Sequence, residues 1–357
     1  MTHLPLACRL SRRSLLLASL GAASAAWALP PRTLQFPRDF GSHPEMKTEW
    51  WYITGHARSS KGREFGFQVT FFRSRIDAAQ GMRSAFAAKH LLFAHAAVTD
   101  LEGRVLLHDQ RIARAGFGIA EASVADTDVR LRDWSLARRD GIYTARIPAG
   151  EFTLALRFTP SQAVLLQGSA GLSRKGPDVA QASYYYSEPQ LQTRGSLTLK
   201  GESVDVEGTA WLDHEWSEAL MHPEAVGWDW IGMNLDDGSA LTAFHLRRQD
   251  GSALWSGGSF RTRNGLLRVF RNDEVRFVGT RTWTSPRTQA AYPTQWRVQT
   301  PSGEFEVRAL LDDQELDSSG STGAVYWEGV SDLRDAHGRR VGRGYLEMTG
   351  YAARLRL

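Results

Sequence analysis

One stretch of the sequence combines residue types that could carry out acid–base chemistry on an apolar molecule. It reads Gly-Thr-Ala-Trp-Leu-Asp-His-Glu-Trp over residues 208–216, at the end of a predicted strand. If the alternation of that strand continues, His214 and Trp216 share its inner face, and Asp213 and Glu215 share the opposite face. An imidazole titrates near neutral pH and an indole can face a carbocation, so His214 and Trp216 could protonate or orient an apolar substrate. The same pair could instead be a core histidine packed on an aromatic residue.

The consecutive polar residues of this stretch could also suggest a metal site. Adjacent strand residues point to opposite faces, however, so Asp213, His214 and Glu215 cannot easily converge on one ion. The sequence also has no phosphate loop and no dinucleotide-binding fingerprint. Gln167-Gly168-Ser169-Ala170-Gly171 lacks the spacing of a serine-hydrolase nucleophile elbow. We therefore predict neither a metal nor a cofactor.

Aromatic residues surround acids at several other strand positions. Tryptophans that face a barrel interior could form a ligand-binding wall, although large aromatic residues also fill small barrels by packing alone. The phenols of residues 184–186 fall on both faces of a strand, so one face is available to line a cavity. The candidate ligand-binding residues from these patterns are Trp50, Trp51, Tyr185, Trp228, Trp230, Trp327 and Tyr345.

Two carboxylates are candidate helpers of the histidine. Asp229 lies between two tryptophans, and Glu347 lies in an alternating run with Tyr345 and Thr349. A carboxyl group buried on such a face would have a raised pKa and could serve as an acid, whereas a salt bridge with an arginine at the rim is the structural alternative. The candidate catalytic residues are thus His214, Trp216, Asp229 and Glu347.

Period-two alternation of apolar and polar residues dominates the chain, as in residues 64–71 and 152–158. Turn signals such as Asp236-Asp237-Gly238 and Asn264-Gly265 separate these runs. The pattern predicts an all-β protein made of hairpins that close barrels or sandwiches. An interruption near residues 217–225, which contains Pro223, separates two strand-rich halves, and we place the domain boundary there, between residues 29–218 and 219–357.

The first 28 residues have the features of a twin-arginine export signal. Arg9, Arg12 and Arg13 precede an apolar stretch that is too short to span a bilayer. Ala26-Trp27-Ala28 then supplies a small-x-small cleavage pattern. We therefore expect a periplasmic protein that is soluble after cleavage.

Composition narrows the possible partners. The formal net charge is +4, and three of the positive charges belong to arginines of the signal, so nearly neutral mature residues give no indication of nucleic-acid binding. The single cysteine, Cys8, lies within the signal, which leaves no disulfide and no thiol nucleophile beyond it. No later segment approaches the roughly 18 apolar residues of a membrane span.

Six motifs in order resemble the carotenoid 1,2-hydratase family, also called the AttH-like family. The resemblance covers essentially the whole chain after the signal and implies two consecutive lipocalin-like β-barrels and a cofactor-independent addition of water to an isoprenoid double bond. The motifs are Glu49-Trp50-Trp51-Tyr52-Ile53-Thr54-Gly55-His56, Ala94-His95-Ala96-Ala97-Val98-Thr99-Asp100, Tyr184-Tyr185-Tyr186-Ser187, Trp211-Leu212-Asp213-His214-Glu215-Trp216, Gly227-Trp228-Asp229-Trp230 and Tyr326-Trp327-Glu328-Gly329.

The resemblance also assigns roles to single residues. The histidine and tryptophan of the hydratases fall on His214 and Trp216. Their proton donor is an aspartate in a Tyr-x-Asp on the strand after the Trp-Asp-Trp motif, and residues 241–247 here contain neither an aspartate nor a tyrosine. His245 is the candidate substitute donor and completes the candidate ligand-binding set. Exported relatives tend to accompany lipoprotein-exporting ABC transporter components, which implies a lipid or apolar metabolite and an envelope transporter as partners.

Three hypotheses follow from the sequence. The first is an enzyme in which His214, helped by Trp216 and by Asp229 or Glu347, protonates an alkene without a cofactor. The second is a non-catalytic lipocalin-like carrier of an apolar molecule, which the missing aspartate and the aromatic walls favour. The third is a scaffolding protein of the envelope that needs no cavity.

Overall fold

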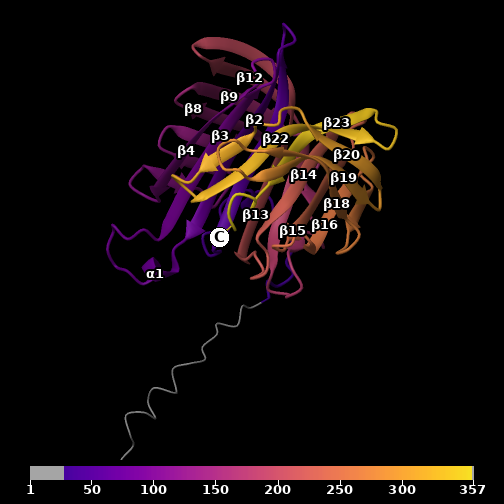
Figure 1. The fold of residues 1–357 in the computed structure, drawn as a ribbon. Coiled ribbons are helices and arrows are strands. Elements are labelled where there is room, and N and C mark those ends of the chain that lie inside the picture. Colours follow the sequence, from indigo (N-terminus) through magenta and orange to yellow (C-terminus); the bar gives the residue numbers. More distant parts are fainter. Residues whose placement is uncertain (1–27, 356–357) are drawn as a thin grey trace, which may run out of the picture.

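The computed structural model describes residues 28–355 of the chain (Figure 1). The predicted export signal lies outside the described residues apart from its last residue. The only helical elements in the described part are the 3-10 helix η1 (Arg38–Phe40) and the single turn α1 (Asp77–Gln80). All other regular structure is β-strand, so the prediction of an all-β protein is confirmed. The part of the chain that the structure describes contains no helix with the length and apolarity needed to cross a bilayer.

The first half of the chain forms one antiparallel sheet in the order β4-β3-β2-β1-β13-β12-β9-β8-β7-β6-β5, with β10 and β11 paired to β12. At the far end of this order the sheet curls back, so that β6 contacts β3 and β4 and the barrel is nearly closed. The strands are β1 (Thr48–Ser59), β2 (Glu64–Arg75), β3 (His90–Asp100), β4 (Val105–Arg114), β5 (Ala120–Ala122), β6 (Asp128–Leu131), β7 (Trp134–Arg139), β8 (Ile142–Pro148), β9 (Phe152–Thr159), β10 (Leu165–Leu166), β11 (Leu172–Arg174), β12 (Ala182–Leu199) and β13 (Glu202–Ala219).

The second half forms a separate antiparallel sheet in the order β17-β16-β15-β14-β23-β22-β20-β19-β18, with β21 paired to β22. The chain passes from the first sheet to the second between Ala219 and Gly227. The strands are β14 (Gly227–Leu235), β15 (Ala240–Arg247), β16 (Ala253–Arg261), β17 (Leu267–Phe270), β18 (Arg276–Thr284), β19 (Ala291–Thr300), β20 (Gly303–Ala309), β21 (Glu315–Ser318), β22 (Ala324–Asp335) and β23 (Arg340–Met348). This architecture agrees with the expectation of two consecutive barrels.

Each sheet buries one apolar face in its own interior, and the strands where the two sheets meet also bury their second face. The interior of the first barrel includes Phe65, Phe67 and Val69, which alternate along β2 as the sequence pattern predicts. A third apolar cluster lies between the barrels, where β1 contacts β23 and β13 contacts β14. Strands at this junction therefore carry large side chains on both faces.

The close approach of the barrels requires a glycine at one position. Gly66 on β2 faces β22 and β23 of the second barrel, and a Cβ atom placed on it would lie 2.7 Å from the Tyr345 hydroxyl oxygen and 2.9 Å from the Val330 Cβ atom. Real Cβ atoms do not tolerate such distances, so any larger residue would push the sheets apart.

We expect Gly66→Ala to lower the free energy of unfolding by about 1–3 kcal/mol, because an extra methyl group overpacks the junction. Chemical denaturation followed by tryptophan fluorescence measures the change. Gly81→Ala is the matched control, since no atom lies within 4 Å of the added methyl group there. Equal stabilities of the two variants would contradict tight packing at the junction.

Candidate active site

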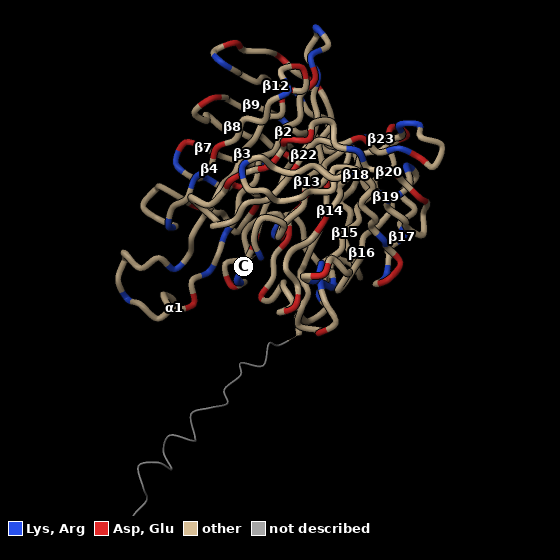
Figure 2. The backbone as a smooth tube through the Cα atoms, in the orientation of Figure 1, with Lys and Arg blue, Asp and Glu red and all other residues tan. Residues whose placement is uncertain are grey.

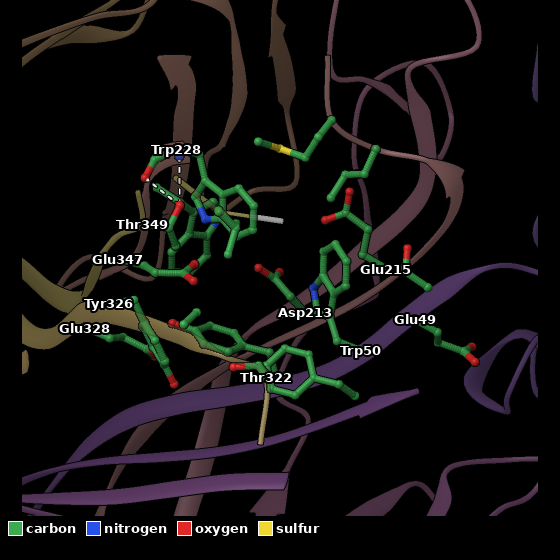
Figure 3. Close-up of a pocket in the computed structure, with 18 of the residues that line it drawn as sticks. Glu49, Trp50, Asp213, Glu215, Trp228, Thr322, Tyr326, Glu328, Glu347 and Thr349 are labelled. Carbon is green, nitrogen blue, oxygen red and sulfur yellow. Dashed lines mark hydrogen bonds between the residues drawn. The ribbon is translucent and has the colours of Figure 1, made fainter. Parts of the chain in front are cut away.

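A cavity of about 290 Å³ lies between the two barrels (Figure 3). Strands of both sheets line it, with β1, β2, β3, β12 and β13 on one side and β14, β15, β22 and β23 on the other. Most of its wall is apolar and aromatic. The aromatic lining consists of Trp50, Tyr52, Phe72, Phe93, Tyr185, Trp228, Trp230, Phe244 and Tyr326.

Two carboxyl groups face each other on adjacent strands of this wall. Glu328 on β22 pairs directly with Glu347 on β23 in the antiparallel register, and both line the cavity (Figure 3). Directly opposed residues have Cβ atoms about 5 Å apart, so two negative charges at these positions would repel strongly. Of the two Glu328 oxygens, one accepts a hydrogen bond from Gln68 at 2.6 Å.

Burial and nearby negative charges raise the pKa values of both carboxyl groups. Burial raises the pKa of Glu328 well above its ordinary value, and the charge of Glu347 adds to the rise. Burial raises the pKa of Glu347 to about 7, and the charges of Asp213 and Glu215 add to this increase while Trp228 opposes it. At least one proton therefore resides on the pair at neutral pH, where it is available for transfer.

A third carboxyl group, Asp213 on β13, lines the same cavity. It accepts hydrogen bonds from the Ser187 hydroxyl at 2.5 Å, the Trp211 indole at 2.7 Å and the Tyr185 hydroxyl at 2.8 Å. Burial raises the pKa of Asp213 to about 7, although these three donors favour its ionised form. Asp213 can thus exchange a proton near neutral pH.

A further acid of the cavity, Glu215, is already paired. The Lys175 ammonium lies 2.9 Å from its carboxylate, and the Ser183 hydroxyl donates a hydrogen bond to it. The same ammonium lies 4.6 Å from the ring centroid of Tyr185 and 4.4 Å from that of Phe244. Aromatic faces and a carboxylate therefore hold this cation in place.

The predicted catalytic pair lies elsewhere, inside the first barrel. His214 and Trp216 are fully buried on the inner face of β13, as strand parity predicts, but neither lines the cavity. Trp51 stacks on the His214 ring at 4.7 Å between centroids, and His43 stacks on Trp216 at 3.8 Å. The structure thus places His214 among packed aromatic rings.

Hydrogen bonds satisfy both nitrogens of His214. Its Nε2 lies 3.0 Å from Glu49, and its Nδ1 lies 3.1 Å from the Tyr186 hydroxyl. Burial lowers the pKa of His214 to about 4 despite the opposing contact with Glu49, so the ring is neutral at pH 7. Burial would raise the pKa of Glu49, but hydrogen bonds from His214 and His43 and the charge of Arg73 hold it well below its ordinary value.

His43, Glu49 and His214 are the described residues whose donor atoms come close enough to hold a metal ion, within 4.8 Å of one another. Each histidine already lies at hydrogen-bonding distance from the same Glu49 oxygen, at 2.8 and 3.0 Å. The Arg73 guanidinium also donates to Glu49 at 2.8 Å. A cation at this position would have to displace a buried arginine, so the contacts fit a hydrogen-bonded network better than a metal site.

Asp229 and His245 meet inside the second barrel. Their side chains are 2.5 Å apart, Arg247 lies 2.8 Å from the same Asp229 oxygen, and the Tyr351 hydroxyl donates to the other oxygen at 3.0 Å. His245 stacks on Phe277 at 4.8 Å between centroids. Neither Asp229 nor His245 lines the cavity between the barrels.

The cavity thus brings together part of the predicted set. Of these residues, Trp50, Tyr185, Trp228, Trp230 and Glu347 line it. Trp51 and Trp327 are packed inside the first and second barrels, and Tyr345 belongs to the apolar cluster between them.

Sequence reasoning did not select several other polar residues of the cavity, among them Asp213, Glu215, Glu328, Lys175, Gln68, Glu49 and Arg73. Strand parity had already separated Asp213 and Glu215 from His214. It would have pointed to them if the outer face of the strand had been considered as a ligand wall. The alternative for Glu347 was a salt bridge with an arginine at the rim. In the described structure the charges that act on Glu347 are instead those of other carboxylates.

Comparison with known proteins places the chain in a family. The AttH-like family model matches residues 27–351, so the chain belongs to the AttH-like family. A solved structure from Nitrosomonas europaea, assigned as an AttH, is 49% identical, covers 91% of this chain and 99% of its own, and superimposes with a TM-score of 0.85. No curated protein matches the chain.

More distant structures share the fold alone. Kievitone hydratase from Nectria haematococca is 15% identical over 90% of this chain and 94% of its own, with a TM-score of 0.70. CghA bound to Sch210972 is 14% identical over 86% of this chain and 89% of its own, with a TM-score of 0.53.

The raised pKa of Glu347 predicts a pH-dependent cost to stability. Because the folded state binds this proton more tightly than the unfolded state, its stabilising contribution is complete below the ordinary pKa of 4.5 and is lost as the pH rises through about 7. Glu347→Gln removes the charge. The free energy of unfolding of this variant, relative to that of wild type, should therefore increase by about 1–3 kcal/mol when the pH is raised from about 5 to about 8.

Urea denaturation of both proteins at the two pH values measures this gain. The control is Glu207→Gln, whose side chain is exposed on β13. A difference between Glu347→Gln and wild type that does not change with pH would show that Glu347 is ionised throughout this range.

Proposed function

We propose that the protein is a cofactor-independent, hydratase-like acid catalyst that protonates a carbon–carbon double bond of an apolar molecule held between the barrels. The observation that carries this proposal is the opposed pair Glu328 and Glu347, which retains a proton at neutral pH on the wall of an aromatic cavity. A general acid works best when its pKa lies near the operating pH.

The geometry supports a balanced sequence of steps. The protonated Glu347 gives its proton to one alkene carbon, the π electrons form the new C–H bond, and the other carbon becomes a carbocation. Indole faces of the wall stabilise this charge. A water molecule then adds through its oxygen, and the resulting oxonium ion releases a proton to the Asp213 carboxylate. Exchange with cavity water returns both carboxyl groups to their starting states.

The charges of the cavity favour a neutral substrate. Five acids and two cations line the cavity, and both cations are already paired, Lys175 with Glu215 at 2.9 Å and Arg73 with Glu49 at 2.8 Å. A fatty acid or a phosphate ester would bring another negative charge next to these groups and would be repelled. A neutral unsaturated molecule, such as an isoprenoid, meets no such penalty.

The relatives support the same direction. The sequence motifs resemble those of carotenoid 1,2-hydratases, which add water without a cofactor, and the chain shares its fold with a protein named kievitone hydratase. In the present chain the acid would come from Glu347 of the cavity, since His214, Trp216 and Asp229 lie inside the barrels.

The second candidate function is a non-catalytic carrier of an apolar molecule or lipid. Its support is the wall of the cavity, most of whose surface is apolar. We propose for either function that the protein acts in the periplasm, after twin-arginine export, and for the carrier that an envelope ABC transporter is its partner.

Activity on a neutral substrate tests the catalytic proposal. Purified protein is incubated with a neutral polyene such as lycopene in isotope-labelled water, and the alcohol product is quantified by mass spectrometry. Glu347→Gln should lower the rate by roughly 100-fold or more, because it keeps the shape of the side chain and removes the transferable proton. Glu207→Gln should retain the wild-type rate.

Binding distinguishes the two functions. Quenching of tryptophan fluorescence reports entry of the polyene into the cavity. If the polyene binds equally to wild type and Glu347→Gln and neither gives product, the carrier is favoured and the hydratase proposal is wrong for this class of substrate.

Export can be tested in the host cell. Arg12→Lys together with Arg13→Lys should leave the protein in the cytoplasmic fraction, because the twin-arginine translocase requires the arginine pair. Fractionation and immunoblotting measure the distribution. An unchanged periplasmic fraction in the double variant would exclude this route.

A further inference from the structure

An exposed apolar surface lies at one end of the first barrel. Phe86 and Phe117 stack with ring centroids 5.5 Å apart, yet Phe86 is 72% exposed and Phe117 is 55% exposed. Met82, in the same loop as Phe86 between β2 and β3, is 53% exposed. We call Met82, Phe86 and Phe117 the aromatic tip. Aromatic side chains that pack on each other and still face the solvent are typical of a docking surface.

Basic residues surround the aromatic tip. The Arg114 guanidinium lies 4.2 Å from the ring centroid of Phe117 and 5.4 Å from that of Phe86. Arg83 and Lys89 are exposed on the loop of residues 76–89, whose single acid, Asp77, pairs with Arg75. Figure 2 shows blue segments on this loop, which projects from the barrel with α1. The surface is therefore apolar at its centre and positive around it.

The aromatic tip lies near the cavity, at the end of the molecule where β2 ends and β3 begins. Its loop joins β2 to β3, and both Ser74 at the end of β2 and Phe93 near the start of β3 line the cavity. Leu355, which follows β23, lines the cavity as well. The backbone N–H of Ala115 donates to the His90 carbonyl at 2.9 Å, which joins the Phe117 turn to the same end.

We propose that the aromatic tip docks on the surface of an anionic lipid bilayer. Aromatic rings insert at the boundary of headgroups and acyl chains, and nearby lysines and arginines are attracted to anionic headgroups. Docking at this end brings the cavity next to the lipid phase, where apolar molecules are dissolved. This surface does not depend on the proton-transfer chemistry proposed above.

Sedimentation with vesicles tests the docking. Protein is mixed with vesicles of phosphatidylcholine alone or with added phosphatidylglycerol. Wild type should sediment with the anionic vesicles and lose binding as the salt concentration rises, because salt screens surface charges. The double variant Phe86→Ser and Phe117→Ser should bind at least about tenfold more weakly, because two aromatic rings are no longer transferred from water into the bilayer.

A matched control and a charge variant complete the design. Leu266→Ser removes a side chain that is 74% exposed on the turn between β16 and β17 of the other barrel, and it should bind as wild type does. Arg83→Gln with Lys89→Gln should weaken binding to the anionic vesicles, by about fivefold for each lost charge. Thermal denaturation checks that each variant remains folded.

Three outcomes would overturn the proposal. The first is wild-type protein that sediments with neither kind of vesicle. The second is a double variant that binds as tightly as wild type. The third is a wild-type dimer, detected by light scattering, that becomes a monomer in the double variant, because the aromatic tip would then be an interface between two copies of the chain.

Discussion

The two-residue period of β13 is the constraint on which both polar centres of the molecule depend. Because successive side chains point to opposite faces, His214 and Trp216 enter the first barrel while Asp213 and Glu215 enter the cavity. A shift of register by one residue would exchange the two sets. It would place carboxyl groups among packed tryptophans and the neutral histidine at the ligand wall. The pairing of β13 with both β1 and β12 along its length prevents such a shift.

The opposed carboxyl groups of β22 and β23 impose a cost that the fold can meet by protonation. Two ionised glutamates directly across an antiparallel pair repel each other, and an apolar wall cannot solvate them. A structural role alone would be met more favourably by a glutamine or by a nearby arginine. The groups that hydrogen-bond Glu328 and Glu347 are instead neutral, namely Gln68, Tyr52 and Trp228, and the charges that act on the pair are those of other carboxylates. Sites that retain such a cost are often functional.

The alternating strand pattern allowed the fold to be predicted, but it predicted only part of the candidate site. Alternation in residues such as Phe65, Phe67 and Val69 predicts strands with one buried face, and the structure confirms it. The same alternation cannot tell whether the second face of β13 meets solvent or another sheet. The burial of Asp213 depends on β14 and β23, which follow it in the sequence and approach it only in the folded chain. Glu328 and Glu347 likewise become neighbours through strand pairing alone.

The buried network of the first barrel acts on the cavity through neighbouring residues. Glu49 lines the cavity and is hydrogen-bonded to His214 inside the barrel, and the residues beside them, Trp50 and Asp213, face the cavity as well. In the register of β1 and β13, Trp50 pairs with Glu215. Contacts of 2.8 to 3.0 Å around Glu49 fix the start of β1. His214, the acid predicted from the sequence, is therefore a positioning residue, which holds the backbone from which the cavity wall projects.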